Sequence, residues 1–260
     1  MKKMLLAGAA FAAFGIAPAL AADFATSPYY AKAPVVPAFY NWAGFYAGLN
    51  AGGASSRNCW NLTGVPGGFG PPAAPVPEGC PNATGGLAGG QVGYRWQASN
   101  WLFGVEAQGD WANLKGSSPS VLVIPGSTVT NQTKIDAIGL FTGNIGYAWN
   151  SVLFYAKGGA AVTHDKYNTI ANTTALAFGQ ATESRWGGAV GTGLEWKFAP
   201  GWSVGVEYDH LFMGNRDLIF TSPVAPIGIV TRTENIKQDV DMGTVRLNYT
   251  FSAAPVFSRY

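Results

Sequence analysis

The chain has 260 residues, enough for one large β-domain or two small ones. Glycine contributes 35 residues and aromatic residues 13%, whereas charged residues make up only 12%, about half the usual share. When an export signal carrying Lys2 and Lys3 is removed, the 16 basic residues fall to 14, against 14 acidic ones, which excludes the basic footprint that nucleic-acid binding requires.

Residues 1–22 have the pattern of a cleaved signal peptide. A short basic start precedes an apolar, alanine-rich stretch, and Ala19-Leu20-Ala21 supplies the small residues that signal peptidase requires. We expect cleavage after Ala21 or Ala22; a retained membrane helix is the alternative. Residues 23–40 carry three prolines and no clear period, and are predicted to form an extended periplasmic linker.

From residue 41 onward, the chain divides into eight segments with a period of two. In 101–111 every odd position is apolar, aromatic or glycine, whereas Glu106, Gln108 and Asp110 occupy even positions. About ten residues with Trp at both ends is the length of a tilted strand that crosses a bilayer. The predicted strands are 42–53, 86–96, 101–111, 134–149, 152–163, 184–197, 202–212 and 239–251.

Long and short connections alternate between these strands. The long ones are 54–84, 115–130, 165–182 and 214–237, and the short ones are 97–100, 150–151 and 199–201. A soluble β-sandwich also has short strands, but it is not expected to keep an apolar stripe on one face of all eight segments. We therefore predict, over residues 41–251, an all-β fold, an eight-stranded antiparallel up-and-down transmembrane β-barrel with long external loops and short periplasmic turns.

Cys59 and Cys80 are the only cysteines, and both lie in the first long connection. In an exported chain the simplest interpretation is one disulfide, worth roughly 3 kcal/mol for a loop of this order. Two free thiols or a metal pair is the alternative, although no histidine lies nearby in sequence to complete a metal set. We expect no metal and no cofactor.

Four segments carry a family resemblance. Residues 41–52, Asn-Trp-Ala-Gly-Phe-Tyr-Ala-Gly-Leu-Asn-Ala-Gly, resemble the opening strand of the small outer-membrane β-barrel proteins of alpha-proteobacteria, porin-family major surface proteins similar to the OmpA transmembrane domain. The proline-rich linker, Lys157-Gly158-Gly159-Ala160 and residues 245–251 resemble the same family. The resemblance covers the whole mature chain.

The resemblance implies the outer membrane of a Gram-negative cell, with lipid and lipopolysaccharide as partners. It also implies recognition by the barrel-assembly machinery, which in this family reads an aromatic residue at the end of the last strand. Here a C-terminal extension, residues 252–260, follows Phe251. The cysteine-bearing connection is a second departure from the family pattern.

Strand parity predicts a barrel interior that contains many charged side chains but has no net charge. Six basic and six acidic residues fall on inward positions: Arg95, Glu106, Asp110, Lys134, Asp136, Lys157, Arg185, Glu195, Lys197, Glu207, Asp209 and Arg246. Eight strands leave room only for side chains, and buried charges must be paired. We therefore expect a salt-bridged plug; a permanently open or gated pore is the alternative.

Outward aromatic residues are predicted to form belts at the two membrane interfaces. They are Trp42, Tyr94, Trp96, Trp101, Trp111, Trp149, Trp186, Trp196, Trp202, Tyr249 and Phe251. A sugar-binding aromatic patch is the alternative. His164 and His210 have no serine and acidic partner that the sequence places convincingly beside them, so we expect no enzyme activity.

These observations predict an outer-membrane protein with a structural role in envelope integrity and a surface presented by its loops. A small-solute porin is the first alternative. A surface receptor or adhesin that binds a host or surface ligand through the loops is the second.

Overall fold

The computed structural model describes residues 41–66, 75–124, 127–224 and 226–251. The predicted signal peptide, linker and C-terminal extension lie outside these residues. One antiparallel sheet contains nine strands: β1 (Gly44–Gly64), β2 (Val76–Gly79), β3 (Asn82–Ala98), β4 (Trp101–Ile124), β5 (Ser127–Trp149), β6 (Val152–Ala171), β7 (Leu176–Ala199), β8 (Trp202–Thr221) and β9 (Val230–Phe251).

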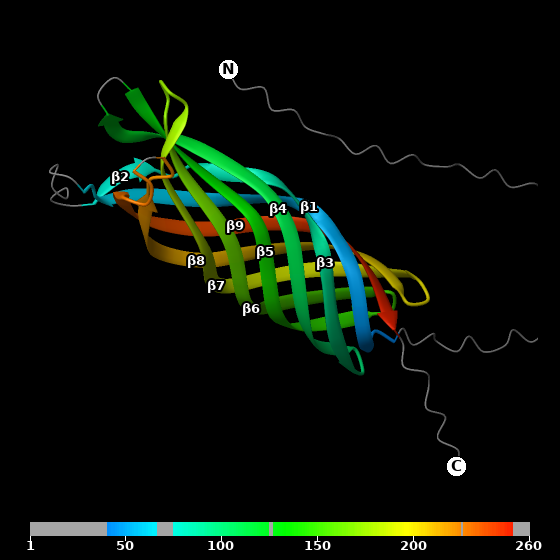
Figure 1. Ribbon diagram of the computed structural model, residues 1–260. Helices are drawn as coiled ribbons and strands as arrows, with labels where there is room; N and C mark the ends of the chain where they lie inside the picture. The colour runs from blue at the N-terminus through cyan, green and yellow to red at the C-terminus, as the bar shows by residue number, and fades with distance from the viewer. Residues whose placement is uncertain (1–40, 67–74, 125–126, 225, 252–260) are drawn as a thin grey trace, which may run out of the picture. The chain divides into compact units, whose positions relative to one another are not determined.

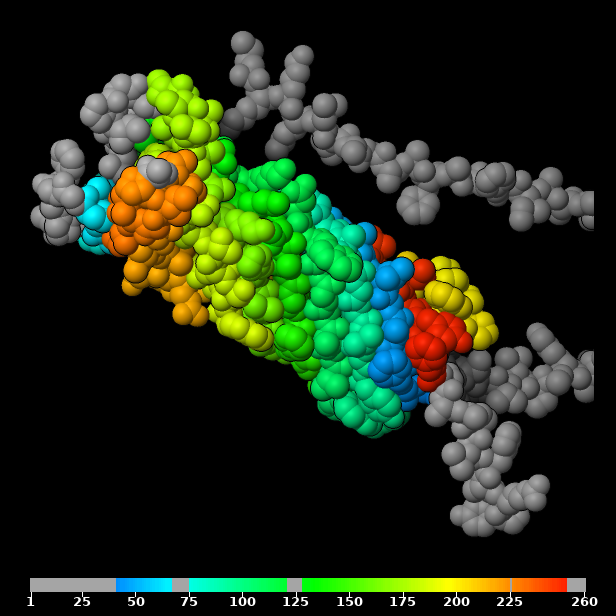
Figure 2. Space-filling model, in the orientation of Figure 1, coloured from blue at the N-terminus to red at the C-terminus, as the bar shows by residue number. Residues whose placement is uncertain are grey.

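The sheet closes on itself. Strands that follow one another in the ring are antiparallel neighbours, and β9 returns to pair with β1 from Phe45↔Phe251 to Gly64↔Thr233. Figure 1 shows the long strands arranged side by side around a common axis, and in Figure 2 β1 (blue) lies against β9 (red). The predicted all-β antiparallel ring of eight strands is confirmed. Strand β2 is additional and pairs with the far end of β1.

The short turns lie where the sequence predicted them. Strands β3 and β4, β5 and β6, and β7 and β8 are separated by two residues each. Ser99 and Asn150 have φ of 57° and 54°, and Gly201 has φ of 79°, as two-residue hairpins require. We call the end of the ring that carries these three turns the turn end, and the opposite end the far end.

The strands are 17 to 24 residues long apart from β2, longer than predicted. Most residues assigned to long connections belong instead to strands; 165–171, for example, continue β6. Hydrophobic alternation was the sequence signal for a strand, and it fades toward the far end, where Ser, Thr and Asn are frequent. The backbone ladder continues there without it.

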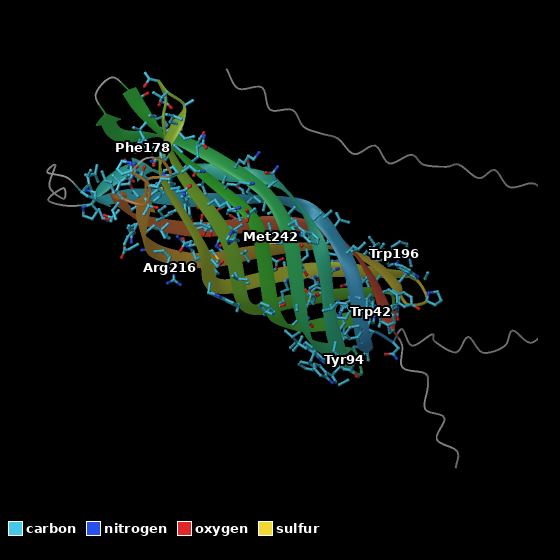
Figure 3. The ribbon with its side chains drawn as sticks, in the orientation of Figure 1. Trp42, Tyr94, Phe178, Trp196, Arg216 and Met242 are labelled. Atoms are coloured by element: carbon cyan, nitrogen blue, oxygen red, sulfur yellow. A yellow bond between two sulfur atoms is a disulfide. The ribbon has the colours of Figure 1, made fainter. Side chains whose placement is uncertain are left out.

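The outer face carries exposed apolar side chains near the turn end, which we call the apolar band. Its larger members include Phe45, Leu49, Tyr94, Trp96, Trp101, Trp111, Phe141, Trp149, Phe154, Trp186, Leu194, Trp196, Trp202, Phe212, Leu247, Tyr249 and Phe251. Figure 3 places Tyr94 and Trp196 near the turn end and Phe178 near the opposite one. Among the described residues, no helix is long and apolar enough to cross a membrane.

Side chains fill the space inside the ring in layers. Trp42, Leu102 and Leu153 belong to an apolar cluster at the turn end. A larger cluster, the apolar plug, lies in the middle: Ala54, Ala83, Leu87, Leu114, Ile135, Ile138, Leu140, Ala161, Ala189, Leu211, Met213, Val240 and Met242. Trp60, Tyr167, Phe220 and Ile236 form a third cluster toward the far end. Polar side chains occupy the space between the clusters.

Candidate functional site

A network of buried charges lies between the turn-end cluster and the apolar plug, and Arg246 is at its centre. One nitrogen of the Arg246 guanidinium pairs with Glu106 and the other with Glu207. Lys157 bridges the same two carboxylates, with Nζ 2.6 Å from Glu207 and 3.4 Å from Glu106, and lies 3.3 Å from Asp209. These five side chains come from β4, β6, β8 and β9, so the network ties opposite walls of the ring together.

Two phenols complete the coordination of these carboxylates. Tyr46 donates to Glu106 at 2.6 Å, and Tyr155 donates to Glu207 at 2.5 Å. Each ring lies over a glycine of the neighbouring strand: a Cβ on Gly93 would be 2.5 Å from Tyr46. Glycine is therefore required opposite each tyrosine, because any side chain would displace the ring from its carboxylate.

A second ion pair lies beside the first group. Arg95 contacts both oxygens of Glu195, at 2.5 and 3.0 Å, and its guanidinium lies 4.0 Å from the centre of the Tyr46 ring. Ser203 and Asn248 donate to Glu195 at 3.0 and 2.9 Å. Such a bidentate pair, with further donors to the carboxylate, offsets much of the loss of hydration that burial imposes.

The network has the character of a structural core and not of a binding site. Its carboxylates are engaged by neighbouring cations, phenols or amides, as the two carboxylates held by Arg246 illustrate. Among the described residues, no group of three His, Cys, Asp or Glu side chains is placed to hold a metal ion. Sequence analysis did not include Tyr46, Tyr155 and Asn248 in the network, although their inward positions on the strands were a signal for it.

Ten of the twelve charged residues that parity placed inside the ring are buried there: Arg95, Glu106, Asp110, Lys157, Arg185, Glu195, Lys197, Glu207, Asp209 and Arg246. Not all of them meet. Lys197 lies near the turn end, 4.6 Å from the ring centre of Trp42, and Arg185 pairs with Glu183 beyond the plug. Asp110 accepts from Gln108 at the edge of the network.

The structure corrects the predicted positions of Lys134 and Asp136. Both were predicted inside, but Asp136 pairs at 2.6 Å with Lys166, which is exposed on the outer face, and Lys134 lies opposite Lys166 in the ladder. The ladder between β5 and β6 shifts between Ile135 and Ala137. This β-bulge inverts the alternation on its far side, so Ile135 enters the plug instead of facing outward.

Beyond the third apolar cluster, a second charged group covers the interior. Glu78 of β2 accepts from Arg232 at 2.5 Å, from Asn131 at 2.5 Å and from Ser120 at 2.6 Å. Arg232 also pairs with Glu234. Sequence analysis missed this group because Glu78 stands in a proline-rich connection with no period; the alternation of Arg232 and Glu234 was the available signal.

Cys59 and Cys80 form the predicted disulfide. Cys59 belongs to β1, and Cys80 follows β2 directly. The bond attaches the end of β2 to β1. Glu78 is therefore only two residues from the covalently held Cys80. The predicted single disulfide is confirmed.

Two buried carboxyl groups on the far side of the apolar band have raised pKa values. Burial raises the pKa of Asp165 to about 6, even though Thr163 and Gln238 donate hydrogen bonds to it. Burial also raises the pKa of Glu234 to about 8, with the nearby Glu78 carboxylate acting in the same direction.

Both histidines have acidic neighbours on the outer face, which sequence analysis did not foresee. His164 lies 3.3 Å from the Ser184 hydroxyl, but its other nitrogen is 3.9 Å from Asp136, beyond hydrogen-bond distance. The Asp136 carboxylate is instead engaged by Lys166. These distances do not match an activated nucleophile, in which the acid hydrogen-bonds to the base and the base hydrogen-bonds to the hydroxyl.

His210 lies 2.7 Å from Asp241, which also accepts a hydrogen bond from Tyr208. This group contains no serine or cysteine, and it provides no nucleophile beyond the phenol.

Ten of the eleven predicted interfacial aromatic residues are exposed on the outer face: Tyr94, Trp96, Trp101, Trp111, Trp149, Trp186, Trp196, Trp202, Tyr249 and Phe251. Trp42 is the correction, because it is fully buried. It precedes the first strand, and its indole N–H donates to the carbonyl of Asn150 at 3.2 Å. It therefore closes the turn end of the ring from within.

Comparison with known proteins agrees with this architecture. The family model described as outer membrane protein beta-barrel domain matches residues 7–251. The chain is 28% identical over 261 residues to the 31 kDa outer-membrane immunogenic protein of Brucella melitensis, covering 96% of this chain and 100% of that protein, and equally similar to the protein of the same description in Brucella suis.

Among solved structures, the outer-membrane protease OmpT of Escherichia coli superposes with a TM-score of 0.50 at 8% identity, covering 83% of this chain and 98% of that one. At this identity the likeness concerns the fold alone. The family match over nearly the whole chain confirms the resemblance carried by the opening strand: the protein belongs to the outer-membrane β-barrel family.

Proposed function

We propose that this protein spans the outer membrane as a closed barrel and has a structural role in the integrity of the envelope. The observation that carries the proposal is the filled interior. Side chains of the apolar plug are at most 9% exposed, and an interior of eight strands has no room for both a plug and a water-filled passage.

The layers on either side of the plug support the same conclusion. An ion that enters from the turn end meets a network in which each terminal nitrogen of Arg246 already pairs with a carboxylate. Beyond the plug it meets Trp60, Tyr167 and Phe220, which are in mutual ring contact through Trp60. Conduction requires a site that an ion can enter and leave, and dry apolar layers oppose both steps.

The apolar band supports the membrane orientation. Its exposed aromatic side chains suit lipid and its interfaces, and the short turns suit the periplasmic side. The far ends of the strands then lie outside the cell. There they extend the barrel into a surface, in place of the long loops that the sequence predicted.

Conductance in planar bilayers tests the closed barrel. The purified protein is expected to be silent, whereas a variant that empties the plug, Leu114→Ala with Leu140→Ala and Leu211→Ala, is expected to show openings. Three matched changes in the apolar band, Leu49→Ala, Leu194→Ala and Leu247→Ala, serve as the control and should remain silent. Steady openings of the unchanged protein would overturn the proposal in favour of a porin.

One observation favours a receptor or adhesin as the second candidate. Apolar side chains are exposed at the far end of the β8–β9 hairpin, where Ile219 is 62% and Ile227 is 78% exposed. The Brucella relatives are described as immunogenic, which is consistent with a surface that other molecules reach. A strain that lacks the gene separates the two roles: sensitivity to detergent supports the structural role, whereas normal resistance with lost surface attachment supports the adhesin.

A further inference from the structure

Three lysines form a row across the outer face of three neighbouring strands. Lys115 of β4 lies directly opposite Lys134 of β5, and Lys134 lies directly opposite Lys166 of β6. The bulge at Asp136 produces this alignment, because it turns Lys134 outward. Like charges directly opposite one another destabilise a sheet, so the arrangement needs a compensating anion.

The protein supplies only part of that compensation. Asp136 pairs with Lys166 at 2.6 Å and also faces His164. Among the described residues, Lys115 and Lys134 make no ion pair within 4.0 Å. The row of three ammonium groups therefore contains a single carboxylate and keeps an excess of positive charge.

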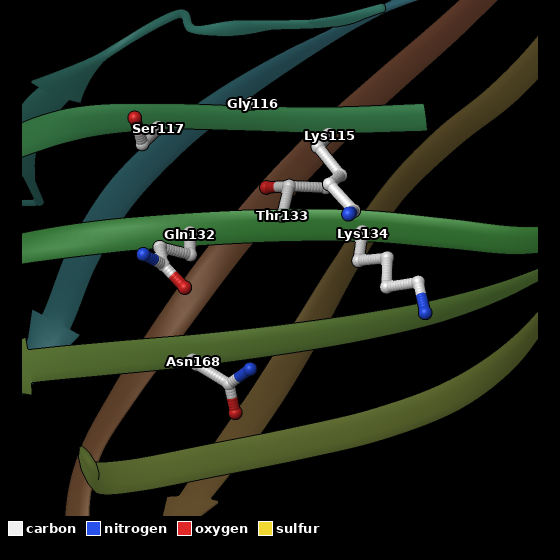
Figure 4. Close-up of a pocket in the computed structure, with 7 residues that line it drawn as sticks. All are labelled: Lys115, Gly116, Ser117, Gln132, Thr133, Lys134 and Asn168. Atoms are coloured by element: carbon white, nitrogen blue, oxygen red, sulfur yellow. The ribbon is translucent and has the colours of Figure 1, made fainter. Parts of the chain in front are cut away.

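A second row of neutral hydrogen-bonding groups runs parallel to the lysines. Ser117 lies opposite Gln132, and Gln132 opposite Asn168. The two rows line a pocket of about 400 Å³, formed by Lys115, Gly116, Ser117, Gln132, Thr133, Lys134 and Asn168. Figure 4 shows the side chains of Lys115, Lys134, Gln132 and Asn168 gathered on these three strands.

The pocket lies just beyond the far edge of the apolar band. Trp111, 80% exposed, precedes Lys115 by four residues on the same face of β4. Phe141, which follows Lys134 by seven residues on β5, and Trp186 of β7 stack in the band, with ring centres 6.2 Å apart. Lysine side chains at such a position extend their ammonium groups to the level of the lipid headgroups.

We propose that the lysine row binds the phosphate groups of a phosphorylated glycolipid in the outer leaflet. Lys115 and Lys134 contact phosphate oxygens as point charges. Ser117, Gln132 and Asn168 provide hydroxyl and amide groups for the sugar. The acyl chains lie along Trp111 and the Phe141–Trp186 pair. The site faces lipid and not the interior, so it does not depend on whether the barrel conducts.

The test is equilibrium binding of lipopolysaccharide in detergent to the folded, purified full chain. A Lys115→Gln/Lys134→Gln variant should bind about thirtyfold more weakly, since each lysine near a membrane surface contributes a factor of roughly five. The control is Arg216→Gln/Lys237→Gln, which removes the same charge from exposed positions of β8 and β9, away from β4, β5 and β6 in the ring. It should bind as the unchanged protein does, and gel mobility before and after boiling verifies that both variants fold.

Two further probes identify the ligand chemistry. Dephosphorylated lipopolysaccharide should bind the unchanged protein as weakly as the phosphorylated form binds the lysine variant. Inorganic phosphate should compete poorly, because it lacks the acyl chains. Equal affinity for the lysine variant and the control, equal affinity for the dephosphorylated lipid, or tight binding of inorganic phosphate alone would each overturn the proposal.

Discussion

Glu207 shows how individual side chains hold the interior together. It pairs with Arg246 and with Lys157 and accepts a hydrogen bond from Tyr155. Two buried cations thus share this carboxylate, and both also contact Glu106. The loss of this charge cannot be compensated by water, because the side chain is enclosed by the turn-end cluster on one side and the apolar plug on the other.

The Glu207→Gln substitution is therefore expected to lower the free energy of unfolding by about 3–5 kcal/mol, the usual cost of removing one partner from a buried ion pair. Urea unfolding in phospholipid vesicles, followed by tryptophan fluorescence, measures the change. Adding Lys157→Met to this variant removes the cation that loses its shortest carboxylate contact and should recover part of the loss. Asp217→Asn, at an exposed position, is the control and should change the value by less than about 0.5 kcal/mol. A loss from Glu207→Gln no larger than the control's would contradict the role assigned to Glu207.

Asp165 provides a prediction about pH. Its folded pKa of about 6 lies above the ordinary value of 3.8 because the carboxyl is buried; Arg185 opposes the shift and Glu183 adds to it. The folded state thus keeps a proton that the unfolded chain releases, so this group favours folding below pH 4 and loses that contribution as the pH rises to 6. The loss above pH 6 is at most about 3 kcal/mol.

Asp165→Asn should remove this dependence. Relative to the unchanged protein, the variant is expected to have a similar free energy of unfolding at pH 4 and a higher one at pH 7. Unfolding curves at a series of pH values provide the measurement. Parallel pH profiles for the two proteins would show that Asp165 does not titrate in this range.

Among the strands, sequence analysis predicted the portions in which apolar and polar residues alternate. The segments 101–111 and 202–212 coincide with the band portions of β4 and β8 because lipid outside and polar groups inside impose a period of two. The same rule failed on β5, where one inserted residue at Asp136 inverts the parity. A bulge leaves no mark in the pattern itself, so Lys134 and Ile135 were each assigned to the wrong face.

Two other elements lay beyond the reach of periodicity. The far halves of the strands are held by the backbone ladder, in which Ser and Thr serve as well as apolar residues, so hydrophobic alternation predicts loops there. Strand β2 has four residues, fewer than any periodic signal requires. Its place is fixed by the disulfide and by the contacts of Glu78, both of which depend on residues distant in sequence.

The closure of the whole ring is likewise a long-range property, since it joins the first long strand to the last. The ladder between β1 and β9 runs from Phe45 to Gly64 with one irregularity after Leu62. The Cys59–Cys80 disulfide lies near the far end of this ladder and crosses only 21 residues of chain. Closure therefore rests on many backbone hydrogen bonds between β1 and β9, whereas the disulfide fastens only the β2 segment.

Reduction of the disulfide is accordingly expected to weaken the protein without opening the ring. The reduced protein should keep the different gel mobilities of its boiled and unboiled forms, because the β1–β9 ladder is intact. Its thermal midpoint should fall, since loop closure by a bond over this separation contributes roughly 3 kcal/mol. The Cys59→Ser/Cys80→Ser variant should behave as the reduced protein does and should not respond to reductant. If reduction abolished the mobility difference, the disulfide and not the ladder would be holding the barrel closed.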